Sequence, residues 1–176
     1  MAAPSNNALH TFSIITKDQP GVLVRIALTF SRRGYNIESL AVSPGAREGF
    51  SRMTITSRGA SDNIEQIKRQ LSKLIDVVYI TDHHDHAPIE VEIALVKLRV
   101  ARDGRAEVAR ITENFESQVA DEDDDTLMLR LSGTSQELDD CIAALMPYNI
   151  EELIRSGKIV MDTGVSPLSD ALNGVG

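Results

Sequence analysis

The stretch that decides the fold is LHTFSIITKDQPGVLVRIALTFSRRGYNI, residues 9–37. It predicts a strand over Leu9–Thr16, in which Phe12 and Ile14 share one face. The turn Asp18-Gln19-Pro20-Gly21 then gives a helix-start signal. Apolar residues recur at helical spacing after it, Arg32 and Arg33 occupy the predicted last turn, and Gly34 ends the helix. The apolar positions are Val22, Leu23, Ile26, Ala27 and Phe30.

The following residues extend this unit by a hairpin, a helix and a strand. The hairpin comprises an extended run Asn36–Ser43, a turn at Pro44-Gly45 and a strand Phe50–Ser57. Ser61 or Asp62 can cap the helix, with Glu65 placed for a capping box. Its expected buried stripe is Ile64, Ile67, Leu71, Leu74 and Ile75. A strand Val77–Thr81 completes the order βαββαβ.

The same order recurs in the second half of the chain. The predicted elements are a strand Val91–Val100, a helix Arg105–Phe115, a short strand near Gln118-Val119-Ala120, a strand Leu127–Leu131, a helix Ser135–Met146 and a strand Ile150–Ile154, with a possible hairpin strand Ile159–Met161. The sequence therefore predicts an α+β protein of two ferredoxin-like domains. The expected divisions are a flexible N-terminus 1–8, a domain 9–82, a linker 83–89, a domain 90–163 and a flexible tail 164–176. In each domain the sheet face without helices needs a cover, so we expect a homodimer.

Charge and composition exclude several classes of protein. Residues 1–87 carry 10 Lys and Arg against 8 Asp and Glu, whereas residues 88–176 carry 8 against 18. Clustered cations are needed to bind phosphates, and Arg32-Arg33 is the main cluster, so we expect no nucleic-acid partner. No apolar run is long enough for a membrane span and no signal peptide precedes residue 9, which predicts a cytoplasmic protein. Cys141 lies on an apolar helix face and is expected in the core.

The loop Asp18-Gln19-Pro20-Gly21 is the best candidate binding site. Amide N–H groups at a helix start lack intrahelical acceptors, and the helix dipole is positive there. Gly21 has no Cβ, so a ligand carboxylate can approach the backbone closely. Asp18 would repel a dianion such as phosphate, whereas Asp18 or Asn36 could bind an ammonium group, which indicates a free amino acid. Alternatively, Asp18 merely caps the helix and Gly21 merely permits the turn.

The loop and the residues after it carry a resemblance to a known family. The order of a strand, the motif D-x-P-G-x-L and a helix resembles that of ACT domains, which are amino-acid-binding modules of regulated enzymes and of some regulators. The block R-G-Y-N-I-E-S-L, residues 33–40, and Ser51-Arg52-Met53-Thr54-Ile55 look like the small regulatory subunit of acetolactate synthase. In the second half, Val96-Lys97-Leu98 and Leu131-Ser132-Gly133-Thr134 are similar to that subunit's C-terminal domain. The resemblance spans about Leu9 to Asp162.

This resemblance implies a regulatory subunit that activates a catalytic subunit and confers feedback inhibition. ACT domains of two chains would pair edge to edge, with Asp18, Gly21, Val22 and Val24 of one chain near Asn36 and Ile37 of the other. The expected effector-binding residues are Asp18, Gln19, Pro20, Gly21, Val22, Leu23, Val24, Asn36 and Ile37. Valine is the usual effector, and leucine or combinations occur. Thiamine diphosphate, Mg²⁺ and FAD belong to the catalytic subunit, so none is expected on this chain.

Other functions remain as alternatives at this point. Tandem ACT domains also occur in regulators of transcription or signalling. His83, His84 and His86 with Asp82 and Asp85 could bind a metal, but their spacing fits no tetrahedral site. The acidic run Asp121–Asp125 lacks the spaced ligands of a calcium loop and is interpreted as a solvated turn. No pattern of nucleophile and base stands on converging elements, so we expect no catalytic site.

Overall fold

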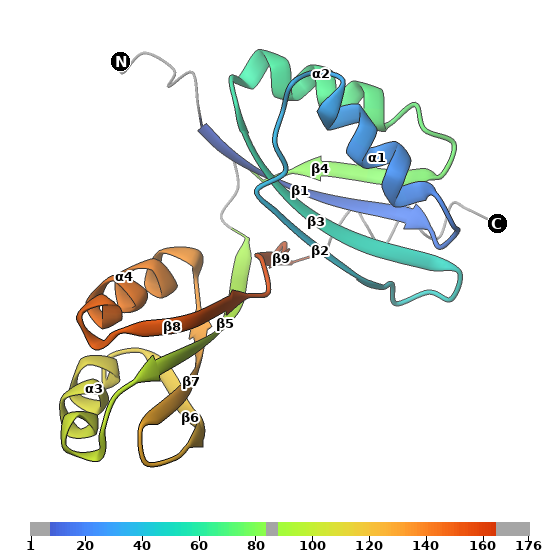
Figure 1. Ribbon diagram of the computed structural model, residues 1–176. Coiled ribbons are helices and arrows are strands. Elements are labelled where there is room, and N and C mark those ends of the chain that lie inside the picture. Colours follow the sequence, from blue (N-terminus) through green and yellow to red (C-terminus); the bar gives the residue numbers. More distant parts are fainter. Residues whose placement is uncertain (1–7, 84–87, 165–176) are drawn as a thin grey trace. The chain divides into compact units, whose positions relative to one another are not determined.

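The computed structural model describes residues 8–83 and 88–164. Residues 1–7, 84–87 and 165–176 lie outside it, and with them most of the predicted N-terminus, linker and tail. The chain forms two compact units. One contains the chain up to Ile89 and again from Val160, and the other contains Glu90–Ile159. The predicted α+β fold with two ferredoxin-like units is confirmed (Figure 1).

The N-terminal unit is a four-stranded antiparallel sheet with two helices on one face (Figure 1). Strand order is β2-β3-β1-β4, so β2 and β4 are the edges. Phe12 pairs with Ile55 and Ile14 with Met53, which puts the apolar residues of β1 and β3 on the same face. The elements are β1 Ala8–Lys17, α1 Val22–Ser31, β2 Ser39–Pro44, β3 Phe50–Gly59, α2 Ser61–Leu71 and β4 Val77–Asp82.

The core of this unit lies between that sheet face and the two helices. Its fully buried members come from every element except the edge strands: Phe12, Ile14, Val22, Ile26, Phe30, Met53, Ile55, Ile64, Ile67 and Leu71. Phe12 and Phe30 meet edge to face, with ring centroids 5.9 Å apart. The expected apolar positions of α1 and α2 are therefore confirmed, except for Leu23, which is 39% exposed, and Ile75. Ile75 is 86% exposed, because α2 ends at Leu71.

In this unit, the boundaries predicted for both helices are wrong. Helix α1 ends at Ser31, so Arg32 is its C-cap and Arg33 lies outside it, although Gly34 does take the left-handed conformation expected of a helix stop. Helix α2 begins at Ser61, and its N-cap residue is Ala60, which makes no side-chain capping hydrogen bond, and not Ser61 or Asp62 as predicted. The capping box expected around Glu65 therefore does not form.

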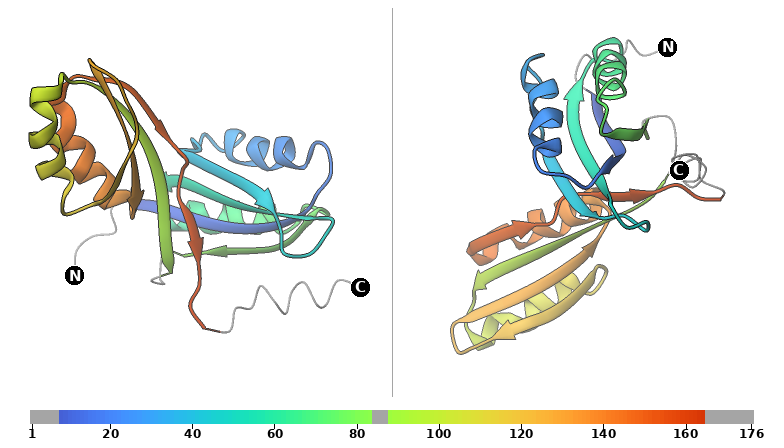
Figure 2. Two further views of the ribbon diagram at one scale, coloured as in Figure 1. Left: turned by 90° about the horizontal axis from the view of Figure 1, so that it is seen from below. Right: turned by 90° about the vertical axis from the view of Figure 1, so that its right-hand side faces the viewer.

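The C-terminal unit repeats the plan with its own core, and Figure 2 shows both of its helices on one side of its sheet. Strand order is β6-β7-β5-β8, and β9 pairs with β5. Leu127, Leu129 and Leu131 alternate into the core, and Cys141 is buried there, as predicted. The elements are β5 Ile89–Arg99, η1 Arg102–Gly104, α3 Arg105–Thr112, β6 Glu116–Glu122, β7 Thr126–Gly133, α4 Ser135–Leu145, η2 Met146–Tyr148 and β8 Ile150–Arg155. Strand β9, Ile159–Met161, begins in this unit and continues into the first.

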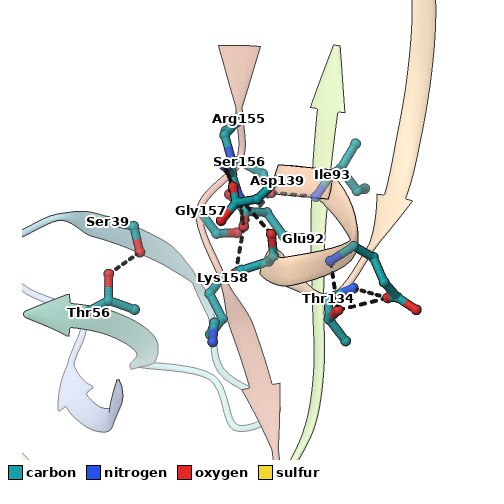
Figure 3. Close-up of polar contacts among 12 residues, drawn as sticks. Ser39, Thr56, Glu92, Ile93, Thr134, Asp139, Arg155, Ser156, Gly157 and Lys158 are labelled. Atoms are coloured by element: carbon teal, nitrogen blue, oxygen red, sulfur yellow. Dashed lines mark hydrogen bonds and ion pairs between the residues drawn. The ribbon is translucent and has the colours of Figure 1, made fainter. Parts of the chain in front are cut away.

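Helix α3 ends earlier than predicted, at Thr112, and Phe115 packs against the core from outside the helix. Helix α4 has the capping box that we expected elsewhere. Thr134 accepts from the amide of Glu137, and the Glu137 carboxylate accepts from the amide of Thr134 at 2.7 Å. These two bonds satisfy donors that a helix start otherwise leaves without partners (Figure 3).

The sheet faces turned away from the helices differ between the two units. In the N-terminal unit, Ser13 is buried and accepts from Arg52, which also donates to the carbonyl of Val160 at 2.6 Å. Desolvation lowers the pKa of Arg52, and the charge of Asp162 opposes that effect. In the C-terminal unit, Ile93 and Leu95 are exposed on the corresponding face. The expected apolar face without a cover is thus a feature of the second unit.

Candidate ligand-binding site

Backbone hydrogen bonds and a glycine conformation define the loop between β1 and α1. The amide of Lys17 donates to the carbonyl of Asp76 at 2.8 Å, and the amide of Asp18 donates to the carbonyl of Gly49 at 2.8 Å. Gly21 is the N-cap of α1 and has φ 85°, a left-handed conformation that favours glycine. The side chains of Asp18, Gln19 and Pro20 are exposed. The β1 end of the loop is therefore fixed by backbone hydrogen bonds, and the side chains that follow are accessible.

Helix α1 begins without a side-chain cap. Asp18 is not the N-cap residue, so it does not serve merely to cap the helix. Across residues 8–83 and 88–164, no acceptor is recorded for the amides of Leu23 and Val24, whereas the amide of Val22 reaches the carbonyl of Gln19 at 3.4 Å. These two amides at the positive end of the helix dipole can bind an anion.

Two charged residues at this loop were not found from the sequence. Arg25 lies four residues after Gly21, and its Nη2 donates to a carboxylate oxygen of Asp76, which is buried. A Cβ placed on Gly21 would stand 3.3 Å from Nη1 of Arg25. The spacing of four residues from Gly21 could have indicated Arg25, since such residues share a helix face. Nothing in the local sequence indicates Asp76.

Asn36 and Ile37 lie beyond the opposite end of α1 from Gly21. A helix of this length, 10 residues, spans about 15 Å. Asn36 is exposed at a hollow lined by Gly34, Tyr35, Asn36, Glu38, Arg58, Gly59, Ala60 and Asn63, and its carbonyl accepts from the hydroxyl of Ser57 at 2.7 Å. Ile37 is half-buried against the core. A single chain therefore does not bring Asn36 and Ile37 together with the glycine loop.

The remaining predicted residues divide between core and surface. The side chain of Val22 is 2% exposed and belongs to the core, so its side chain does not face a ligand. Leu23 and Val24 are 39% and 60% exposed on the outer side of α1. Leu28, one turn further along, and Val42 on the edge strand β2 are exposed as well. This apolar surface is defined by Leu23, Val24, Leu28 and Val42.

The alternative metal sites gain no support from the part of the chain that is described. Within residues 8–83 and 88–164, no group of three or more His, Cys, Asp or Glu side chains could hold a metal ion. His83 is buried, with Nε2 2.9 Å from the hydroxyl of Ser13 and Nδ1 2.9 Å from a carboxylate oxygen of Asp162, whereas His84, Asp85 and His86 lie outside the described residues. The run Asp121–Asp125 is exposed, its first two residues end β6, and Asp123 accepts from the backbone amides of Asp125 and Thr126.

No described helix is long and apolar enough to cross a membrane.

The fold and the glycine loop define an ACT-domain protein, and comparison with known proteins agrees. A family model described as an AHAS small subunit-like ACT domain matches residues 12–79. A second, described as the small subunit of acetolactate synthase, matches residues 91–164. The chain belongs to the family of acetolactate synthase small subunits, which are regulatory subunits of that enzyme.

Individual relatives support this assignment over nearly the whole chain. The small subunit of acetolactate synthase isozyme 3 from Salmonella typhimurium is 40% identical over 86% of this chain and 94% of its own length. The acetolactate synthase small subunit of Mycolicibacterium smegmatis is 36% identical over 88% of this chain and 91% of its own. The crystal structure of the small subunit from Thermotoga maritima has a TM-score of 0.80 at 30% identity, covering 90% and 99% of the two chains.

Proposed function

We propose that this chain binds valine at the loop Asp18–Gly21, activates a catalytic acetolactate synthase subunit, and transmits feedback inhibition to it. One observation carries the proposal. The loop presents the bare amides of Leu23 and Val24 beside a glycine in the left-handed conformation, on a chain of a family of regulatory subunits. Two amide donors and a helix dipole suit a single carboxylate.

A homodimer would complete the site. When two copies pair through the same edge strand, the two-fold axis reverses the partner's α1, so the start of one helix faces the end of the other. Gly21 of one chain would then approach Asn36 and Ile37 of its partner. The bare edge of β2 and the apolar surface of Leu23, Val24, Leu28 and Val42 support this pairing.

The chemistry of the paired site matches a small branched zwitterion. The amides of Leu23 and Val24 would bind the carboxylate, and the side-chain oxygen of Asp18 or Asn36 would accept from the ammonium group. Val24 and Ile37 would contact the branched side chain. Valine would therefore bind one arrangement of the dimer more tightly and shift contacts with the catalytic subunit toward inhibition.

The catalytic partner would supply the chemistry of acetolactate formation, with thiamine diphosphate, Mg²⁺ and FAD bound on that subunit. A tandem ACT regulator of transcription or signalling is the competing function. Co-purification separates the two: the proposed function requires a stable complex with a thiamine-dependent catalytic subunit and an increase in its rate. A chain that neither binds nor activates such a subunit would support the competing function.

Replacement of Gly21 tests the site in the reconstituted enzyme. Gly21→Asp adds a negative charge beside the amides, so activation should persist while valine inhibition is lost. Gly164→Ala is the control for backbone strain, because Gly164 has φ 77°, no atom within 4 Å of an added Cβ, and no part in the loop. Full valine inhibition of the Gly21→Asp enzyme would refute the assignment.

Mixed dimers test whether two chains share the site. Gly21→Asp and Asn36→Ala should each abolish valine inhibition as homodimers. In a mixed dimer, one site combines the intact Gly21 of one chain with the intact Asn36 of the other. Mixing the two variants, by unfolding and refolding them together, should therefore restore partial inhibition. If mixing restores none, the two residues do not act in a shared site.

A further inference from the structure

The guanidinium of Arg25 lies next to the glycine loop with its two edges in different surroundings. Its Nη2 donates to Asp76, and its Nη1 is 3.3 Å from the point where a Cβ of Gly21 would stand. Throughout the described part of the chain, Nη1 has no recorded acceptor. The Arg25 side chain is 46% exposed, so a ligand in solution can reach it.

Asp76 holds this arginine in place. Its side chain is 9% exposed, and its backbone carbonyl accepts from the amide of Lys17, the last residue of β1. A buried carboxylate requires a cation, so the pair restricts the orientation of Arg25. Asp76 thereby ties the guanidinium to the same loop that carries Gly21. One edge is fixed by the protein, and the other faces the space above the glycine.

We propose that Arg25 binds the effector carboxylate together with the bare amides of Leu23 and Val24, and that Asp76 is its positioning residue. This inference rests on the proposed function and adds a residue to its site. A guanidinium offers several donors in one plane, so a single guanidinium can bind two carboxylates through separate edges. Such a site selects ligands that carry a carboxylate over amines of the same shape.

The proposal also changes the expected effect of Gly21→Asp. The new side chain would start 3.3 Å from Nη1 and place a carboxylate directly against Arg25. It would then occupy the guanidinium edge that the ligand needs, in addition to repelling the ligand by its charge. A larger loss of affinity for Gly21→Asp than for Gly21→Ala is therefore expected, although both strain the backbone at φ 85°.

Calorimetric titration of the full-length chain with valine tests the role of Arg25. Arg25→Gln should weaken binding about tenfold or more, as expected for loss of a hydrogen bond between charged groups. Arg69→Gln, an exposed arginine of α2, is the matched control and should bind like the wild type. Circular dichroism of each variant establishes that it is folded.

The double variant Arg25→Gln/Asp76→Asn separates ligand binding from a structural role. If Arg25 only neutralises the buried Asp76, removing both charges restores wild-type affinity, and the inference is overturned. If Arg25 binds the carboxylate, the double variant stays as weak as Arg25→Gln. Absence of valine, leucine and isoleucine binding by the wild type would instead contradict the proposed function itself.

Discussion

Each unit buries one acidic side chain against an arginine, and the two pairs differ in how completely the arginine is satisfied. In the C-terminal unit, Arg155 donates to both oxygens of Glu92, each at 2.8 Å, and its third nitrogen pairs with Asp139 (Figure 3). In the N-terminal unit, Arg25 donates to Asp76 through Nη2 alone. We call the Glu92–Arg155 pair closed, because all three nitrogens of the arginine are used, and the Asp76–Arg25 pair open. A closed pair can stabilise its own domain, whereas the open pair retains donors that could bind a ligand.

The first turns of α4 and α1 show the same contrast between donors with and without acceptors. At the start of α4, the amides of Thr134 and Glu137 donate to each other's side chains. At the start of α1, the amides of Leu23 and Val24 have no acceptor in the described part of the chain. The hollow at the start of α4 is moreover lined by Glu90, Glu116 and Glu137, whose charges would repel a carboxylate. Two copies of one fold therefore differ in which hydrogen-bond donors lack an acceptor, because of a few local contacts.

The largest expected effect comes from opening the closed pair. Glu92→Ala leaves Arg155 without its buried partner and should lower the free energy of unfolding by about 3 kcal/mol. Urea unfolding of the full-length chain measures this, with Glu152→Ala, an exposed residue of β8, as the control. Valine affinity should be unchanged. Equal stability of the two variants would show that the Glu92–Arg155 pair is not stabilising.

A smaller effect is expected from removing the helix cap of α4 and adding one to α2. Thr134→Ala removes the capping box of α4 and should cost about 1 kcal/mol. Ala60→Ser should instead stabilise α2, because Ala60 has the extended backbone of an N-cap residue and no side-chain oxygen. Thermal unfolding measures both. Opposite shifts in Tm would support the comparison, and a stabilising Thr134→Ala would contradict it.

The smallest effect is expected for the change in the free energy of unfolding as the pH falls below neutrality. Burial raises the pKa of Glu92, but hydrogen bonds from Arg155 and Ser135 outweigh it and hold the pKa below its usual 4.5. A lowered folded-state pKa contributes stability above pH 4.5 that is lost as pH falls through the folded-state value. The stability difference between wild type and Glu92→Gln should therefore be constant near neutral pH and shrink below pH 4.5. A difference that grows on acidification would contradict this sign.

The sequence predicted the order of elements because apolar periodicity records which face each element buries. Phe12 with Ile14, and Leu127 with Leu129, are on the expected faces. Helix ends were harder to predict, because competing local signals decide them. Ile75 continues the spacing of Leu71, yet the helix stops at Leu71 and Ile75 turns to solvent.

The candidate site could be located from the sequence only as far as its backbone. Glycine and proline report the conformation of residues 18–21 directly, so the loop was found. The pairing of Arg25 with Asp76 joins residues 51 positions apart, and only tertiary structure brings them together. Placing Asn36 near Gly21 required the resemblance, because the two lie beyond opposite ends of α1.

The exposure of Asp18, Gln19 and Pro20 has an evolutionary consequence. None of these side chains belongs to the core cluster, so substitutions there cost little stability. Under the proposed function, point mutations in this loop can therefore change which small metabolite is preferred while the core beneath the loop persists. A protein with the proposed function can thereby acquire a new ligand without a change to the domain that carries the loop.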